Sequence, residues 1–245
     1  RRAFTPRTRA ILVNTPHNPT GKVFTRAELT LIAELCQHHG VIALCDEVYE
    51  HLIFEPGHRP HVRLATLPGM AERVLTLSSL GKSFSLTGWK IGWAIGPADL
   101  TKAVRAAHQF LTFATATPLQ HAAAAALSMH EQRERALADL VATLSVNREF
   151  LLGVLERCGV RTIRPHGAYF IVGDWTGSKF ARSGRRLDDD RAFCTFLTTD
   201  VGVAAIPPSV FYTNKGHGRS LARFAFCKRP ETLRAAAERL EGWAG

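Results

Sequence analysis

Apolar and polar residues alternate in blocks that predict strands and helices in the N-terminal part of the chain. Ala10 to Asn14 is a short apolar run, and the loop after it contains prolines and a glycine, which interrupt helix and sheet hydrogen bonding. Thr25 is a candidate helix N-cap with Glu28 three residues later, and the apolar spacing that follows predicts an amphipathic helix that stops at Gly40. Val41 to Cys45 is a second apolar strand. This strand, helix and strand favour a parallel sheet covered by helices.

Further strands and helices are predicted downstream. The apolar runs Val74 to Ser78 and Ile91 to Ile95 predict two more strands. Pro118 opens an alanine-rich stretch of high helix propensity. A long helical pattern then extends from about Glu131 to Arg157 and is expected to carry the chain away from the sheet.

Beyond Gly159 the pattern changes to short β-rich pieces joined by charged or glycine-rich loops. The predicted strands are Ala168 to Val172, Val201 to Ile206 and Leu221 to Phe226, and the predicted closing helix is Pro230 to Trp243. The loop Gly177 to Asp190 is rich in arginine, glycine and aspartate and is expected to be a surface insertion. We therefore predict two domains: residues 1–145 form the larger sheet domain, and residues 146–245 form a smaller α+β domain.

The composition narrows the class of protein. Hydrophobic residues make up 46% of the 245 residues and charged residues 21%, which is enough for a sizeable core. No apolar run approaches the roughly 20 residues of a membrane helix, and no signal peptide is recognisable, so a soluble cytoplasmic protein is expected. The net charge of +10 is spread along the chain with few interleaved aromatics, so nucleic-acid binding is not expected. The five cysteines show no CxxC or metal-ligand spacing and are expected to be reduced.

Polar residues stand at the predicted strand ends. Asn18 follows the first strand, Asp46 closes the second, and the segment Ser78 to Lys82 follows the third. Ligands of parallel α/β sheets bind beyond the carboxyl ends of the strands, so these residues are expected to converge. Asp46 with Glu47 and His51 would be an alternative metal-ligand set, but the stretch lacks the spacing of known motifs, and no metal is predicted.

Four stretches carry a family resemblance: NTPHNPTGKV, CDEVYEHLIF, SSLGKSFSLTGWKIGW and RFAFCKR. Each alone would be weak, but together, in this order and across nearly the whole chain, they are specific. The sequence resembles the class I and II (fold type I) pyridoxal-phosphate aminotransferases, and most of all the kynurenine, methionine and N-succinyldiaminopimelate aminotransferase group. The resemblance implies an α/β protein of that fold, with a mostly parallel sheet in an incomplete large domain and a smaller C-terminal α+β domain.

The resemblance implies a pyridoxal phosphate site. Lys82 matches the lysine that holds the cofactor as a Schiff base and afterwards moves a proton between the substrate Cα and the cofactor. Asp46 matches the carboxylate that keeps the ring nitrogen protonated, so that the ring acts as an electron sink. Tyr49 and Asn18 match residues that hydrogen-bond the phenolic oxygen of the ring.

The same resemblance implies residues for the phosphate and the substrate. Ser79 and Lys90 occupy positions that bind the cofactor phosphate, and Lys90 stands where many relatives have an arginine with its bidentate fork. Arg223 matches the arginine that holds the substrate α-carboxylate. Tyr169 and Phe170 either line the same pocket or simply pack in the core.

The implied activity is ping-pong transfer of an amino group from an L-amino acid to a 2-oxo acid by a homodimer. Three alternatives stay open: a C–S β-lyase of the same fold, a non-catalytic sensor domain of a transcription regulator, and a decayed gene product. The sequence does not identify the amino donor or the oxo acid acceptor.

The chain opens on Arg1 without a methionine, and we interpret it as N-terminally truncated. In relatives, the part before this point brings a phosphate-binding loop, an aromatic ring stacked on the cofactor, and residues that cross the dimer interface. The chain alone is therefore expected to be poorly soluble or inactive.

Overall fold

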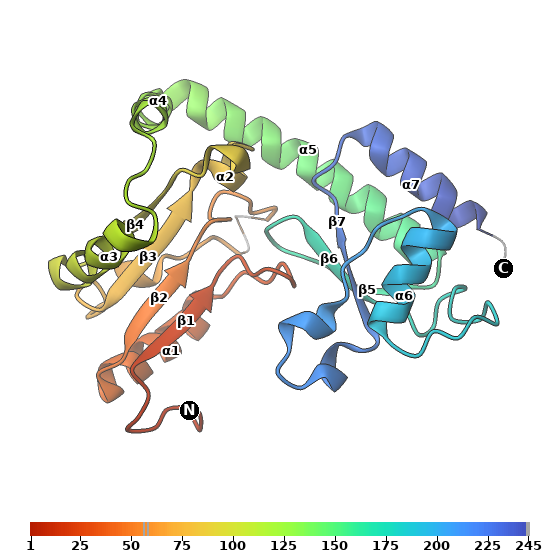
Figure 1. Ribbon diagram of the computed structural model, residues 1–245, viewed down its shortest axis with the longest axis horizontal. Helices are drawn as coiled ribbons and strands as arrows, with labels where there is room; N and C mark the ends of the chain where they lie inside the picture. Colours follow the sequence, from red (N-terminus) through yellow and green to blue (C-terminus); the bar gives the residue numbers. More distant parts are fainter. Residues whose placement is uncertain (56, 58, 244–245) are drawn as a thin grey trace. The chain divides into compact units, whose positions relative to one another are not determined.

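Two compact units make up this computed structural model, which describes residues 1–55, 57 and 59–243 (Figure 1). The first unit consists of residues 1–17 and 22–141, and the second of residues 18–21 and 142–245. The division therefore falls inside the long helix α5 (His130–Arg157), and the tetrapeptide Asn18–Gly21 belongs to the second unit although it lies early in the chain.

A four-stranded sheet is the centre of the first unit (Figure 1). Its strands, in spatial order, are β1 (Ala10–Asn14), β2 (Ile42–Asp46), β3 (Val74–Ser79) and β4 (Gly92–Ile95). The first three are parallel, and β4 runs antiparallel to β3. Asn14 pairs with Asp46 in the register, so the carboxyl ends of β1 and β2 meet at one edge. This confirms the predicted α/β class with a mostly parallel sheet.

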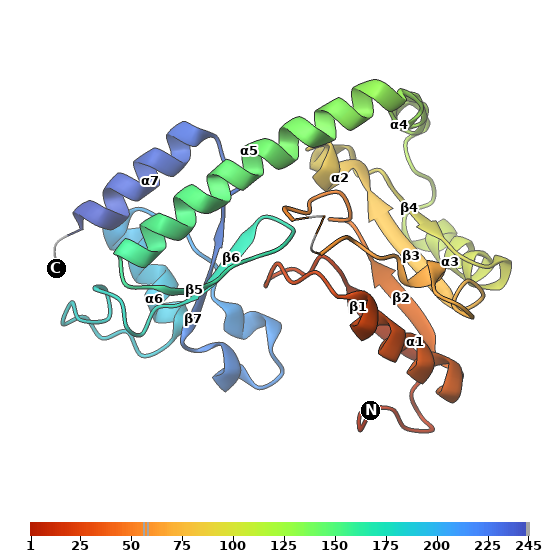
Figure 2. The same cartoon turned by 180° about the vertical axis from the view of Figure 1, so that it is seen from behind.

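Helix α1 (Arg26–His39) runs along β1 and β2 and covers one face of this sheet (Figure 2). Its buried residues recur at helical spacing, and they pack against inward-facing side chains of three strands. The helix contributes Leu29, Ala33 and Cys36, and the strands contribute Val13, Ala43, Cys45 and Val74. The packing explains why both flanking strands are apolar.

Both ends of α1 have the caps that the sequence predicts. The Thr25 hydroxyl accepts a hydrogen bond from the Glu28 backbone N–H at 3.2 Å, and the Glu28 carboxylate accepts one from the Thr25 backbone N–H at 2.8 Å. Lys22 Nζ lies 2.5 Å from Glu28 Oε1. At the other end, Gly40 adopts a left-handed conformation with φ of 64° that ends the helix.

The carboxylate of Glu28, which caps α1, makes part of the stability of the fold depend on pH. The hydrogen bond from Lys22, followed by the one from the Thr25 backbone, lowers the pKa of Glu28 from 4.5 to about 2. A lowered pKa stabilises the fold above the unfolded value, so this contribution is complete above pH 4.5 and is lost as the pH falls towards 2. We expect Glu28→Gln to cost no more than about 1 kcal/mol at pH 7, because the pair is exposed to solvent.

Urea unfolding at pH 7 and at pH 3 measures this contribution. The difference in the free energy of unfolding between the wild type and Glu28→Gln should be largest at the higher pH and clearly smaller at the lower one. Glu34→Gln is the matched control, because Glu34 is an exposed glutamate of the same helix. A gap between the wild type and Glu28→Gln that is equally large at both pH values would contradict the assignment.

Two of the remaining helices of the first unit, α2 (Leu80–Ser83) and α3 (Ala98–Leu111), are not predicted from the sequence. The unit also contains α4 (Thr117–Ser128) and the start of α5. Helix α3 buries none of its residues, and its apolar side chains Phe110 and Leu111 are 86% and 81% exposed. Among the described helices, none has the length and apolar sequence required to cross a bilayer.

The second unit is built on an antiparallel sheet. Its strands, in spatial order, are β5 (Arg161–Ile163), β6 (Phe170–Asp174) and β7 (Leu221–Ala225), and its further helices are α6 (Asp190–Phe196) and α7 (Pro230–Gly242). Aromatic rings fill its core: Trp175 stacks on Phe193 with centroids 4.6 Å apart, and Phe180 packs beside Phe193.

One local prediction for this unit is wrong, and a second is right only in part. Val201 to Ile206 is not a strand: Val201 is the last residue of a π-helical segment, Leu197–Val201, that continues α6 and ends at Gly202 with φ of 78°, and residues 202–205 form neither helix nor strand. Only Ile206 makes a bridge, and its partner is Arg223 of β7. Leu197 and Val201 are buried at helical spacing. The β-branched residues Val201, Val203 and Ile206 favoured the strand prediction instead. The predicted surface loop from Gly177 is also partly internal, since Phe180 is 1% exposed.

The tetrapeptide Asn18–Gly21 is held in the second unit by backbone contacts. The carbonyl of Gly21 accepts hydrogen bonds from the backbone N–H groups of His166 and Gly167 at 2.9 and 3.0 Å. Gly21 has φ of 67°, and a Cβ at this position would lie 2.3 Å from Pro165 Cβ. Only glycine therefore fits this close approach.

Candidate functional site

Asp46 and Tyr49 lie in the turn that follows β2. Asp46 ends the strand, and its Oδ1 accepts a hydrogen bond from the Val48 backbone N–H at 3.2 Å, which fixes the start of the turn. The Glu50 N–H donates to the Glu47 carbonyl at 2.8 Å and closes it. Tyr49 is 3% exposed. The turn thus places a half-buried carboxylate and a buried phenol at the carboxyl end of the sheet.

Lys82 follows the neighbouring strand β3 on the short helix α2. Ser79 ends β3 and caps this helix, since its hydroxyl accepts a hydrogen bond from the Gly81 N–H at 3.2 Å. The Nζ atom of Lys82 lies 5.9 Å from the centroid of the Tyr49 ring. Two residues that are far apart in the sequence therefore meet where β2 and β3 end.

A cavity of about 280 Å³ opens beside Lys82. Its lining consists of Ser79, Gly81, Lys82, Leu86, Thr87, Lys90, Ile91 and Gly92. Lys90 has a left-handed backbone with φ of 57°, which is uncommon for a residue other than glycine. The cavity gathers one hydroxyl and two amines among the residues predicted to bind the cofactor.

Arg223 and Asn18 meet in the second unit. Arg223 lies in the middle of β7, and its Nη1 donates a hydrogen bond to Asn18 Oδ1 at 2.9 Å. Its guanidinium lies over two aromatic rings, 4.3 Å from the centroid of Phe170 and 5.2 Å from that of Phe211. Tyr169 packs edge-on against Phe170, with ring centroids 4.6 Å apart. Phe211 was missed by the sequence analysis, because no motif marks it.

The predicted site residues thus fall into two groups. The first unit holds Asp46, Tyr49, Ser79, Lys82 and Lys90, and the second holds Asn18 and Arg223. Of the residues considered as metal ligands, Glu47 lies near Glu50 and His61 rather than in a set with Asp46 and His51. Four of the five cysteines are buried free thiols, and burial raises the pKa of Cys45 to about 12, which makes this thiol unreactive.

The chemistry of the first group fits pyridoxal phosphate. The aldehyde of that cofactor requires an amine, its ring nitrogen a carboxylate and its phenolic oxygen a hydrogen-bond donor, and the phosphate dianion requires hydroxyl and cationic groups. Lys82, Asp46 and Tyr49 are groups of the first three kinds. Ser79 and Lys90, which line the same cavity as Lys82, are groups of the last kind.

Comparisons with known proteins agree with this chemistry. The model of the family "aminotransferase class I and II" matches residues 2–240. The chain is 42% identical over 248 residues to kynurenine–oxoglutarate transaminase 3 of Mus musculus, a match covering 98% of this chain and 54% of the relative. It is 43% identical to a probable N-succinyldiaminopimelate aminotransferase of Mycobacterium tuberculosis, with 98% and 59% covered.

Solved structures show the same similarity. The N-succinyldiaminopimelate aminotransferase from Mycobacterium tuberculosis superimposes with a TM-score of 0.90 and 44% identity, covering 98% of this chain and 60% of that one. A methionine aminotransferase from Escherichia coli superimposes with a TM-score of 0.87 and 35% identity, covering 99% and 60%. The chain thus spans less than two thirds of the length of these relatives. Proteins of the matching family use pyridoxal phosphate.

Proposed function

Because the chain belongs to the class I and II aminotransferase family, we propose that it carries the catalytic residues of an enzyme that moves an amino group from an L-amino acid to a 2-oxo acid. The two substrates react in turn at one site. The observation that supports this proposal best is the cavity shared by Ser79, Lys82 and Lys90, with the Tyr49 ring beside the Lys82 amine.

The residues of the first unit hold the cofactor in this proposal. Pyridoxal phosphate supplies, when bound, an electron-withdrawing ring that stabilises negative charge at the substrate Cα. Lys82 binds it covalently through Nζ and, once released, carries a proton to and from Cα. Asp46 provides a negative charge for the ring nitrogen, and Ser79 and Lys90 bind the phosphate by a hydroxyl donor and a point charge.

Arg223 and Asn18 serve the substrate and the ring in this proposal. A guanidinium has five N–H donors, so Arg223 can donate to Asn18 and still bind a carboxylate through further N–H groups. The rings of Phe170 and Phe211 attract the guanidinium and favour its present position. The Asn18 amide uses its oxygen for Arg223, and its NH₂ is the type of donor that a phenolic oxygen requires.

The full-length protein is proposed to be a homodimer in the cytoplasm. Dimerisation is typical of the family. The apolar side chains of Phe110, Leu111 and Phe113 are each at least 81% exposed in this chain, and such exposed apolar groups favour an interface with another protein surface. Free cysteines suit a reducing compartment. Light scattering of the purified full-length gene product measures the oligomeric state, and a monomeric mass would contradict the dimer.

Borohydride reduction of the full-length gene product in the presence of pyridoxal phosphate tests the proposed function. Peptide mapping should find the reduced adduct on Lys82 and not on Lys90, which lines the same cavity. Absence of an adduct on Lys82 would overturn the cofactor assignment. A protein that binds the cofactor but releases pyruvate and ammonia from a cysteine conjugate, without any oxo acid, would instead be a C–S β-lyase.

A further inference from the structure

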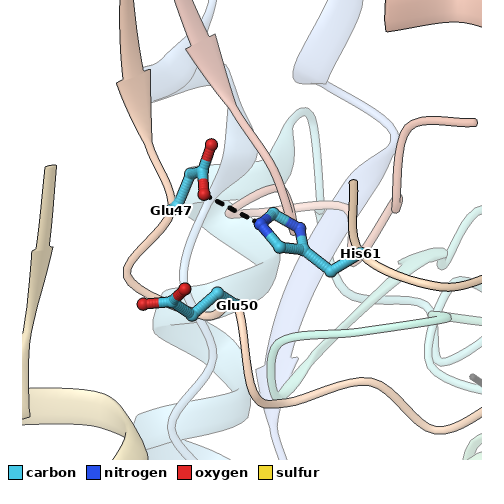
Figure 3. Close-up of side chains that lie close together, drawn as sticks. All are labelled: Glu47, Glu50 and His61. Atoms are coloured by element: carbon cyan, nitrogen blue, oxygen red, sulfur yellow. Dashed lines mark hydrogen bonds and ion pairs between the residues drawn. The ribbon is translucent and has the colours of Figure 1, made fainter. Parts of the chain in front are cut away.

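A cluster of buried ionisable side chains includes two residues of the turn that carries Asp46 and Tyr49. Glu47, Glu50 and His61 place one nitrogen or oxygen atom each within 4.8 Å of one another (Figure 3). Their side chains are 0%, 8% and 9% exposed. His61 Nε2 lies 2.9 Å from Glu47 Oε2, and the carboxylate accepts the hydrogen bond. None of these groups has a place in the proposed chemistry.

Arg63 supplies the positive charge of this cluster. Its Nη2 contacts the Glu50 carboxylate directly, and its Nε lies 3.1 Å from Glu50 Oε2 and 3.7 Å from Glu47 Oε2. Burial acts to raise the pKa of Glu50, but the hydrogen bonds from Arg63 and Ser78 outweigh it and hold that pKa below its usual value. The guanidinium contacts both carboxylates and offsets part of their negative charge, so a metal ion would have to displace it or share the space with a like charge.

The cluster touches both strands whose ends form the candidate site. Ser78, near the end of β3, donates a hydrogen bond from its hydroxyl to Glu50 Oε1 at 2.9 Å. Three members of the cluster are also direct sequence neighbours of residues proposed to bind the cofactor. Glu47 follows Asp46, Glu50 follows Tyr49, and Ser78 precedes Ser79.

We propose that the cluster of Glu47, Glu50, His61, Arg63 and Ser78 positions Asp46, Tyr49 and Ser79 for pyridoxal phosphate by fixing the backbone beside each of them. Its members are positioning residues, since they act through their neighbours. The hydrogen bond between Ser78 and Glu50 ties the end of β3 to the turn after β2. This inference rests on the proposed function, because the benefit of a fixed geometry appears only when the cofactor is bound.

Cofactor affinity of the full-length gene product tests the inference. We expect Ser78→Ala to raise the Kd for pyridoxal phosphate about threefold to tenfold, the equivalent of one hydrogen bond. Ser78→Thr, which keeps the hydroxyl, should restore the wild-type affinity. Thr76→Ala is the matched control, because Thr76 lies on the same face of β3 and is as buried as Ser78, at 8% exposed.

The melting temperature of the cofactor-free protein separates positioning from general stability. Ser78→Ala and Thr76→Ala should melt within a few degrees of each other, while only the first loses affinity. Equal affinities of these two variants, with the wild type binding normally, would overturn the inference alone. A wild type without any pyridoxal phosphate binding would overturn the proposed function as well. A stoichiometric divalent metal that is lost in Glu50→Gln would show that the cluster is a metal site instead.

Discussion

Lys82→Ala is expected to lower the kcat for transamination by at least about 10⁴-fold, because one substitution removes both the covalent link to the cofactor and the proton carrier. Lys82 lines the same cavity as Ser79 and Lys90, and no other residue of that lining except Lys90 carries an amine. Steady-state rates with an amino donor and a 2-oxo acid measure the effect. Added small primary amines should restore part of the activity, since they replace the missing base.

Lys102→Ala is the matched control for Lys82→Ala, because Lys102 is an exposed lysine of α3 in the same unit. It should leave the rate unchanged. The Lys82→Ala protein should also lose the shift in visible absorbance that an amino donor produces with the wild type. A variant that kept this shift and turned over within tenfold of the wild type would contradict the assignment.

Arg223→Lys is expected to lower kcat/KM for amino acids about 10²- to 10³-fold, a loss of roughly 3 to 4 kcal/mol. Lysine keeps the positive charge but loses the planar fork that binds a carboxylate through two hydrogen bonds. It also loses the flat group that lies over Phe170 and Phe211. The loss should fall mainly on KM, because the carboxylate is bound in the ground state as well as in the transition state.

Activity with amines that lack a carboxylate distinguishes carboxylate binding by Arg223 from a purely structural role of this residue. The wild type should prefer an amino acid strongly over the matching amine, and Arg223→Lys should narrow the preference. Arg219→Lys, an exposed arginine just before β7, is the control and should behave as the wild type. If Arg223→Lys kept the wild-type preference for the amino acid over the amine, another residue would bind the substrate carboxylate.

The sequence predicted correctly those helices and strands whose formation depends mainly on residues close together in the chain. The capping pair Thr25 and Glu28 determines the start of α1, and the apolar runs before Asn14 and Asp46 are the buried strands β1 and β2. The strand predicted at Val201 to Ile206 was wrong, because Val201 is buried as the last residue of a helical segment and residues 202–205 form neither helix nor strand. Burial outweighs β-propensity there, and no neighbouring residue signals it.

In the candidate site, too, residues in local motifs could be identified from the sequence, whereas residues brought together only by the fold could not. Asp46 and Lys82 stand in motifs at strand ends, so they could be identified from the sequence, although their roles stay predictions. Phe211 reaches Arg223 only through the fold, and no local signal marks it. His61 is likewise brought to Glu47 by the chain that returns after the turn, whereas sequence proximity suggested His51.

The assignment of Asn18–Gly21 to the second unit bears on the order in which the protein folds during synthesis. Asn18 and Arg223 are hydrogen-bonded across a sequence separation of 205 residues. Closing so long a loop costs entropy before any contact repays it, which makes such pairings late and slow. A nascent chain that ends before β7 lacks Arg223, so the second unit can be completed only after β7 has been synthesised. Cleavage of the chain between Gly21 and the start of α1 would likewise separate the second unit from one of its own parts.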